Sequence, residues 1–136
     1  MKRIILIVLV LGVLGALITY AFVFRKSATN VNSAKAELEI SSDSLLFYFE
    51  QDEVRANTLY LDKVIKVSGT IAEISSTETG VSIYLKNPDT MSGVLCGFSE
   101  TPHGLEALKV GDMVSIKGIC RGYLMDVNLN KCSLAR

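Results

Sequence analysis

The stretch from Ile4 to Phe24 contains no charged residue, and a basic pair borders it at each end, Lys2-Arg3 before it and Arg25-Lys26 after it. A helix rises about 1.5 Å per residue, so this stretch would extend roughly 30 Å, the thickness of the hydrocarbon core of a bilayer. The sequence therefore predicts a single-pass membrane helix within residues 1–26. The rest of the chain is then a small domain held at a membrane.

A cleaved secretory signal is the alternative interpretation of the N-terminus. The apolar run is longer than the roughly 7–15 residues of a signal's apolar region, no small-x-small cleavage motif follows Phe24, and a basic pair adjoins the apolar end. The flanking basic residues are nearly balanced, with the comparison favouring the N-terminus inside. We expect an uncleaved anchor in the inner (cytoplasmic) membrane, with the domain on the extracytoplasmic side.

The chain beyond the predicted anchor is acidic. Without the four flanking basic residues, 10 of the 14 Lys and Arg remain against all 14 Asp and Glu, which gives a net charge of −4. Nucleic-acid-binding surfaces are usually recognised by clustered Lys and Arg, and here the charges are interspersed. This part of the chain is long enough for one domain with one core.

Residues 27–40 are mostly small and polar, which is typical of a tether. The domain is therefore predicted to occupy residues 41–136. It begins with a helix, because the N-cap residues Ser41-Ser42-Asp43 precede an apolar stripe of Leu45, Leu46 and Phe49. We expect this helix to end near Asn57, a residue that tolerates left-handed backbone.

Five later segments alternate apolar and polar residues, as half-buried strands do. They run over 65–71, 81–85, 94–98, 114–120 and 127–134, with a phase slip after Leu129 that a β-bulge would absorb. Turns are predicted at 75–80, 87–89 and 121–126. A short helix is predicted between the third and fourth strands, from Thr101-Pro102 to Gly111-Asp112.

This order of elements predicts a mainly β domain with helices, a five-stranded OB-fold barrel preceded by an α-helix. Gly69 and Gly118 interrupt inward-facing positions of the first and fourth strands, which are neighbours in such a barrel. Residues without a Cβ suit the places where strands of a small closed barrel bend sharply.

Several segments together resemble the tRNA_anti-like family of bacterial OB-fold domains. They include the run from Leu45 to Glu53, Val94-Leu95-Cys96-Gly97-Phe98, Lys117-Gly118-Ile119-Cys120 and the run from Val127 to Cys132. The resemblance covers roughly residues 41–134 and implies an OB-fold on a membrane or lipoprotein anchor. The family's biochemical role is largely uncharacterised, and the fold by itself does not indicate tRNA binding.

No residue pattern indicates catalysis, a metal site or a cofactor. The one histidine, His103, lies in a Thr-Pro-His-Gly segment that is typical of a solvated loop. There is no phosphate-binding glycine loop, no HExxH motif, and no Ser or Cys with a plausible base. We expect the protein not to be an enzyme and to need no cofactor.

Three cysteines fall at inward strand positions, where a free thiol behaves as a small apolar group. In an OB barrel the third and fifth strands are parallel neighbours, which brings Cys96 and Cys132 together and places Cys120 at the opposite end of the fourth strand. Buried thiols are the first interpretation, and a disulfide between Cys96 and Cys132 is the second.

The favoured function is a non-catalytic binding module for a protein or small ligand of the cell envelope. Nucleic-acid binding is the alternative, because OB-folds often bind oligonucleotides on their second and third strands and the adjoining loops. The outward residue Tyr84 and its neighbour Leu95 are candidate anchors for a partner, unless the leading helix covers them. The full set of candidate binding residues is Lys66, Tyr84, Lys86, Leu95, Arg121 and Tyr123.

Overall fold

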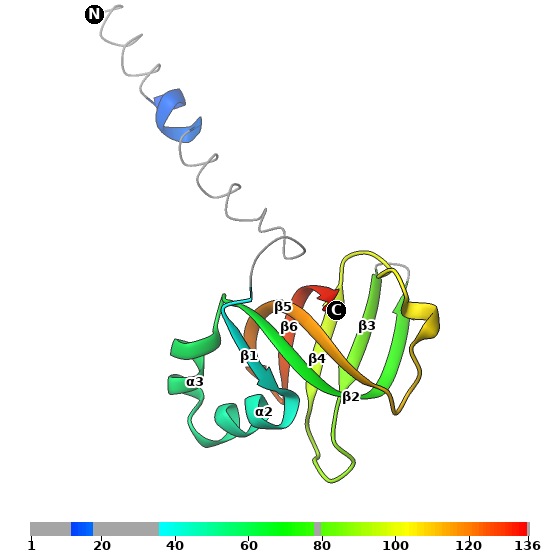
Figure 1. The fold of residues 1–136 in the computed structure, drawn as a ribbon. Helices are drawn as coiled ribbons and strands as arrows, with labels where there is room; N and C mark the ends of the chain where they lie inside the picture. Colours follow the sequence, from blue (N-terminus) through cyan, green and yellow to red (C-terminus); the bar gives the residue numbers. More distant parts are fainter. Residues whose placement is uncertain (1–11, 18–35, 78–79, 136) are drawn as a thin grey trace, which may run out of the picture. The chain divides into compact units, whose positions relative to one another are not determined.

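A computed structural model describes residues 12–17, 36–77 and 80–135 (Figure 1). Residues 12–17 are helical. Most of the predicted membrane helix, both of its basic pairs and most of the predicted tether lie outside the described residues. Within the described ranges, no helix has the length and apolar character needed to cross a membrane.

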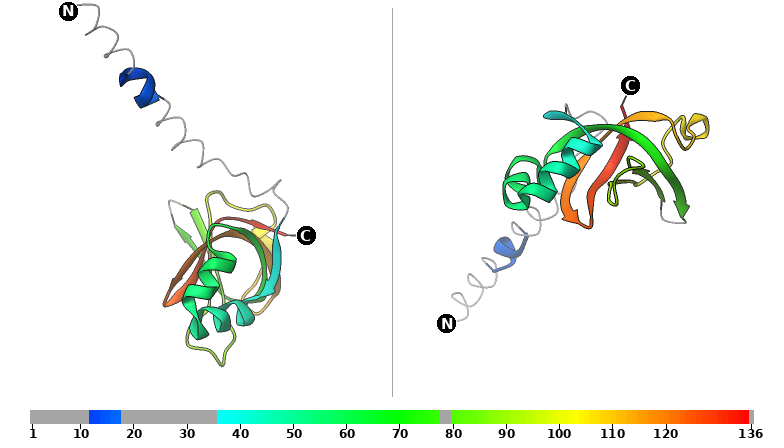
Figure 2. Two further views of the ribbon diagram at one scale, coloured as in Figure 1. Left: turned by 90° about the vertical axis from the view of Figure 1, so that its left-hand side faces the viewer. Right: turned by 90° about the horizontal axis from the view of Figure 1, so that it is seen from below.

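The domain is a closed barrel of five strands: β2 (Val64–Thr77), β3 (Gly80–Leu85), β4 (Val94–Phe98), β5 (Met113–Leu124) and β6 (Asp126–Leu134). They follow the order β2-β3-β4-β6-β5, and a β2–β5 pairing closes the ring (Figure 2). β4 and β6 are parallel, and the other barrel pairs are antiparallel. The predicted five-stranded barrel, with its first and fourth strands adjacent, is confirmed.

Two strands are longer than predicted. The first half of β2 pairs with β5 and its second half pairs with β3, with an irregularity between Ile71 and Glu73 where the change occurs. Residues 75–77, predicted as turn, are hydrogen-bonded to β3, and residues 121–124, also predicted as turn, extend β5. These polar segments are strands because a partner strand satisfies their backbone groups, which composition alone does not reveal.

The predicted bulge after Leu129 is confirmed. Asn130 pairs with Ile119 and Ser133 pairs with Lys117, so β6 has one more residue than β5 between these pairs. Lys131 lies in this bulge with a φ of 53°. Because of the extra residue, the side chains of Cys132 and Leu134 pack against the core.

Two helices precede the barrel where one was predicted. They are α2 (Ser42–Gln51) and α3 (Glu53–Tyr60), separated by Asp52 with its extended φ of −156°. The Asp52 side chain accepts a hydrogen bond from Arg55 N at 3.0 Å, so this residue ends one helix and caps the next. Ser41 caps α2 by accepting from Ser44 N, as its position predicts.

The predicted apolar stripe of α2 is buried, and it joins the barrel core. Leu45, Leu46 and Phe49 are almost fully buried and belong to the same apolar cluster as the inward residues of the strands. α2 therefore covers part of the barrel core and leaves the outer faces of β3 and β4 to other contacts.

One further strand and one shorter helix differ from the prediction. Residues at the end of the predicted tether form β1 (Leu38–Ser41), which pairs in parallel with the first half of β2. The predicted helix near Thr101-Pro102 is a single 3₁₀ turn, η1 (Leu105–Ala107), whose N-cap is Gly104 with a φ of 90°. Because the left-handed Gly104 is the N-cap, this turn begins at Leu105 and not at the predicted cap, Thr101.

Gly118 and Gly69 lie at inward positions, as predicted, and a Cβ at either would have no room because neighbouring side chains pack against it. A Cβ on Gly118 would lie 2.6 Å from Cys132 Sγ and 3.2 Å from Leu129 Cβ. A Cβ on Gly69 would overlap the side chain of Ser42 at the start of α2. The two glycines let β6 and α2 pack closely against the neighbouring strands.

Candidate ligand-binding face

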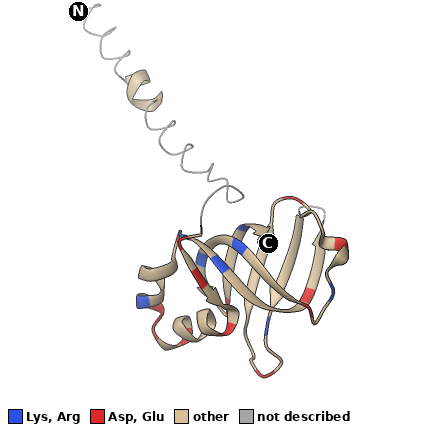
Figure 3. Ribbon diagram, in the orientation of Figure 1, with Lys and Arg blue, Asp and Glu red and all other residues tan. Residues whose placement is uncertain are grey.

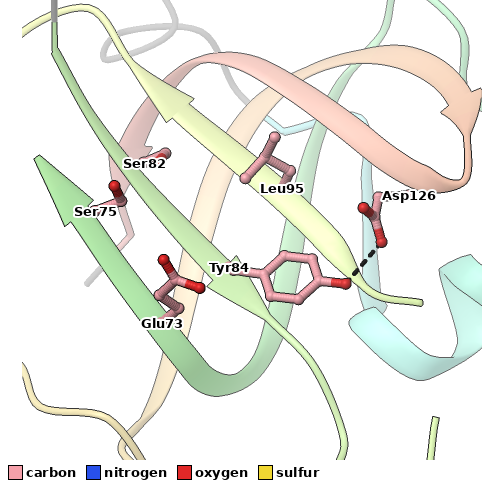
Figure 4. Close-up of a pocket in the computed structure, with 6 residues that line it drawn as sticks. All are labelled: Glu73, Ser75, Ser82, Tyr84, Leu95 and Asp126. Atoms are coloured by element: carbon pink, nitrogen blue, oxygen red, sulfur yellow. Dashed lines mark hydrogen bonds between the residues drawn. The ribbon is translucent and has the colours of Figure 1, made fainter. Parts of the chain in front are cut away.

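A pocket of about 310 Å³ lies on the outer face of the sheet, where β2, β3 and β4 pass side by side (Figure 4). Its lining comes from these strands and from the first residue of β6, and it consists of Glu73, Ser75, Ser82, Tyr84, Leu95 and Asp126. The set combines one aromatic side chain and one aliphatic side chain with two carboxylates and two hydroxyls.

Strand register builds this pocket from two neighbouring rows. In the first row, Tyr84 on β3 stands opposite Glu73 on β2 and opposite Leu95 on β4. In the second row, Ser82 stands opposite Ser75 and opposite Gly97. Because the second row has only small side chains and the first has large ones, the face is hollowed beside Tyr84.

Tyr84 is fixed in place by its hydroxyl group. Tyr84 Oη donates to Asp126 Oδ1 at 2.7 Å, and the backbone N–H of Gly93 donates to the same oxygen at 2.9 Å. Asp126 directly follows Met125, whose φ of 67° makes the tight turn from β5 into β6. The tyrosine ring is therefore held along the sheet by two loops that flank it.

The environment of Tyr84 also keeps its hydroxyl protonated. Partial burial of the ring, the hydrogen bond to Asp126 and the charge of that carboxylate together raise the pKa of Tyr84 from 10.0 to about 12. Gly93 contributes space, since a Cβ there would lie 3.0 Å from Tyr84 Cζ. The neutral hydroxyl is a permanent donor to Asp126 at neutral pH.

Of the six predicted binding residues, Tyr84 and Leu95 come together in the pocket. Leu95 is 37% exposed, and neither residue lies beneath α2, whose apolar stripe packs into the barrel core. Lys86 follows β3 two residues after Tyr84 and does not line the pocket.

The other three predicted residues lie elsewhere and already have partners. Lys66 Nζ is 3.2 Å from Glu39 Oε1 on the neighbouring β1, and Arg121 forms an ion pair with Asp62. The ring of Tyr123 stacks on that of Phe49, with centroids 6.0 Å apart and planes at 24°. Tyr123 therefore packs on the leading helix.

Glu73 and Asp126 line the pocket but were not predicted as site residues. The first predicted strand stopped at Ile71, and Asp126 was assigned to a turn. One signal could have indicated Glu73: the apolar Ile74 is out of phase with the inward Ile65, Val67 and Ile71, so a bulge after Ile71, as observed, places Ile74 inward and Glu73 and Ser75 outward. No comparable sequence signal brings Asp126 to Tyr84, 42 residues before it.

Cys96 and Cys132 approach each other, as the predicted strand order requires. The pKa of Cys96 is raised well above 9.0, mainly by a hydrogen bond with the Cys132 thiol and secondly by burial. Burial also raises the pKa of Cys120, whose strand partner is Leu129. Leu129 on β6 pairs with Cys96 as well, so Cys120 lies level with Cys96 on the other side of β6 and not at the far end that the sequence suggested. All three residues are thiols in the structure, and the disulfide stays a prediction.

Within 36–77 and 80–135, no three His, Cys, Asp or Glu side chains are grouped in a way that could hold a metal ion. Strand register places Lys66 on β2 opposite Lys117 on β5, and Figure 3 shows several basic segments side by side on the central strands, whereas most acidic segments lie nearer the loops. The pocket brings one aromatic and one aliphatic side chain together with two carboxylates.

One solved structure that resembles this chain supports the fold. A lipoprotein from Klebsiella pneumoniae subsp. pneumoniae, proposed to bind nucleic acid, superposes with a TM-score of 0.55 at 19% identity, over 73% of this chain and 92% of that one. The Stn1–Ten1 complex of S. pombe gives a TM-score of 0.38 at 18% identity, over 54% of this chain and 58% of that chain. No curated protein matches the sequence.

The sequence profile of the tRNA_anti-like family matches residues 1–134, nearly the whole chain. This match agrees with the five-stranded barrel and with the family resemblance found in the sequence. The chain belongs to the tRNA_anti-like family.

Proposed function

We propose that the protein is a non-catalytic binding module of the bacterial cell envelope that holds a partner on the face around Tyr84. The observation that carries this proposal is the preformed pocket, in which Tyr84 is fixed by Asp126 beside the exposed Leu95. Aromatic residues held rigidly beside aliphatic ones are typical anchors of interfaces, because little side-chain entropy is lost when a partner binds.

The pocket is poorly suited to acid–base catalysis. An effective general acid or base has a pKa near the working pH, whereas the pKa of Tyr84 is about 12. Asp126 is occupied by two donors that hold its Oδ1. These features support binding and not turnover.

Nucleic acid is the second candidate partner, because the structurally similar Klebsiella lipoprotein has been proposed to bind it. The local charge opposes this candidate here. Glu73 and Asp126 line the pocket, and Lys66 and Arg121 are paired with carboxylates. Nucleic-acid affinity depends on free cations that replace counterions on phosphates. The protein should therefore show no salt-sensitive binding to single-stranded DNA or RNA at micromolar concentration, and tight binding that weakens steeply with salt would favour this second function.

Site-specific photocrosslinking tests the binding face. A photoreactive amino acid replaces Leu95 in one variant and Leu59 on α3 in another, since the two leucines are 37% and 39% exposed. In native membranes, position 95 should yield a discrete crosslinked product and position 59 should not. Equal products at both positions, or none at 95, would refute the proposed face.

We further propose that residues 1–26 anchor this module in the inner membrane with the domain on the extracytoplasmic side. The uncharged stretch and its two basic borders support the proposal. Cells should contain full-length protein in the membrane fraction, and a reporter fused after Arg136 should be active only when exported. A mature chain that starts after Phe24 and is soluble would overturn the anchor.

A further inference from the structure

We propose that the pocket beside Tyr84 receives a cationic side chain, a guanidinium or ammonium group on an arginine or lysine of a partner protein. The inference rests on the proposed binding function and specifies the chemistry of the partner. It follows from the charge, the shape and the aromatic surface of one small site.

The charge of the pocket is negative and uncompensated. Glu73 and Asp126 lie on either side of the Tyr84 ring, and no Lys, Arg or His lines the pocket (Figure 4). Among the described residues, Glu73 has no ion pair and no side-chain hydrogen bond, and the two donors to Asp126 both contact Oδ1. The second carboxylate oxygen of Asp126 and both oxygens of Glu73 therefore remain available to donors from a ligand.

The shape suits one long side chain. A volume of about 310 Å³ is at the low end of the roughly 300–1,000 Å³ of small-molecule sites. The row formed by Ser75, Ser82 and Gly97 gives the hollow, and Leu95 gives an aliphatic wall. Arginine and lysine place an aliphatic stem against such a wall while the charged end reaches the carboxylates.

The tyrosine ring adds a second attraction for a cation. A guanidinium or ammonium group over a tyrosine face is stabilised by the ring quadrupole, and the fixed hydroxyl of Tyr84 keeps that face in place. A phosphate in the same position would meet two carboxylates and be repelled. The net charge of −4 beyond the predicted anchor also favours approach of a basic partner.

The test uses the full chain, ¹⁵N-labelled in detergent micelles, titrated with N-acetyl-arginine N-methylamide. The amide signals of Ser82, Tyr84, Leu95 and Gly97 should shift together, and N-acetyl-norleucine N-methylamide, which lacks the charge, should shift them much less. Glu73→Gln should weaken arginine binding about two- to fivefold, as expected for one partly exposed ion pair. The matched control is Glu106→Gln, which removes the same charge from the exposed η1 turn and should leave binding unchanged.

Three outcomes would overturn the inference. The first is that arginine amide leaves the pocket signals unmoved, and the second is that Glu73→Gln and Glu106→Gln weaken binding equally. The third is that spermidine binds more tightly than arginine amide, which would indicate a free polyamine as the ligand. A crosslink at position 95 that persists with any of these results keeps the binding face and removes only its cation preference. Loss of the crosslink itself counts against the proposed function.

Discussion

Replacing Gly118 by alanine tests how closely β5 and β6 pack. The new Cβ would lie 2.6 Å from Cys132 Sγ and 3.2 Å from two carbons of Leu129. Non-bonded heavy atoms are most stable at about 3.5–4.0 Å, so the overlap with sulfur is about 1 Å. Leu129 is 1% exposed and cannot move away, whereas the half-buried Cys132 can rotate at the expense of its contact with Cys96.

Overpacking of this kind costs about 1–3 kcal/mol, and we expect about 2 kcal/mol for Gly118→Ala. In a domain of this size, each kcal/mol lowers the melting temperature by about 4–8 °C, so the decrease should be about 8–16 °C. Gly97→Ala is the matched control, because its Cβ would meet nothing closer than 3.6 Å, and it should change stability by at most about 0.5 kcal/mol. Thermal unfolding followed by circular dichroism measures both.

A double-mutant cycle with Cys132→Ala identifies the contact responsible. Without the sulfur atom, the added methyl group of Gly118→Ala should be tolerated better, with a coupling energy of at least about 0.5 kcal/mol. Strict additivity of the two substitutions, or a Gly118→Ala variant as stable as Gly97→Ala, would refute the argument that Cys132 occupies the space of the missing Cβ.

Two further predictions concern single groups. Tyr84→Phe removes the hydrogen bond to Asp126 and should lower the free energy of unfolding by about 1–2 kcal/mol at neutral pH. The pKa of Tyr84 is about 12 in the folded protein and 10.0 in the unfolded chain, so its contribution to the free energy of unfolding should be fully present below pH 10 and lost as the pH rises towards 12. Urea unfolding of the wild type and Tyr84→Phe over a pH series measures this contribution. A stability difference between the two proteins that grows above pH 10 would contradict the prediction. Mild oxidation with diamide should join Cys96 to Cys132 and leave Cys120 a thiol, as shown by non-reducing peptide mapping; any bridge to Cys120 would contradict the observed packing.

The barrel was predictable because its signal is local. Each strand buries alternate Val, Ile, Leu, Cys or Phe side chains, and a residue in the wrong phase, as after Leu129, requires a bulge. Strand ends were not predictable, since Ser75 and Arg121 are strand residues only because another segment pairs with them. The same holds for β1, which consists of four residues that complete a free edge of β2.

In the candidate site, too, positions on regular strands were predictable and contacts made by loops were not. Alternation places Tyr84 outward in any antiparallel barrel, so sequence alone could identify it. The partner that fixes its ring, Asp126, comes from a turn whose position depends on where β5 ends. Side chains on regular strands can be assigned to a face in advance, whereas contacts between loops require the closed structure.

Charge was the least predictable property of the face. The sequence offered Lys66 and Arg121 as candidate contacts for a nucleic acid, and the fold brings each to a carboxylate that is 27 or 59 residues away. Exposed ion pairs of this kind add little stability, but they reduce the positive potential that a phosphate would meet. Glu73, by contrast, remains without an ion pair among the described residues. The sequence alone was compatible with an anionic or a cationic ligand. The folded arrangement of charges around Tyr84 favours a cationic one.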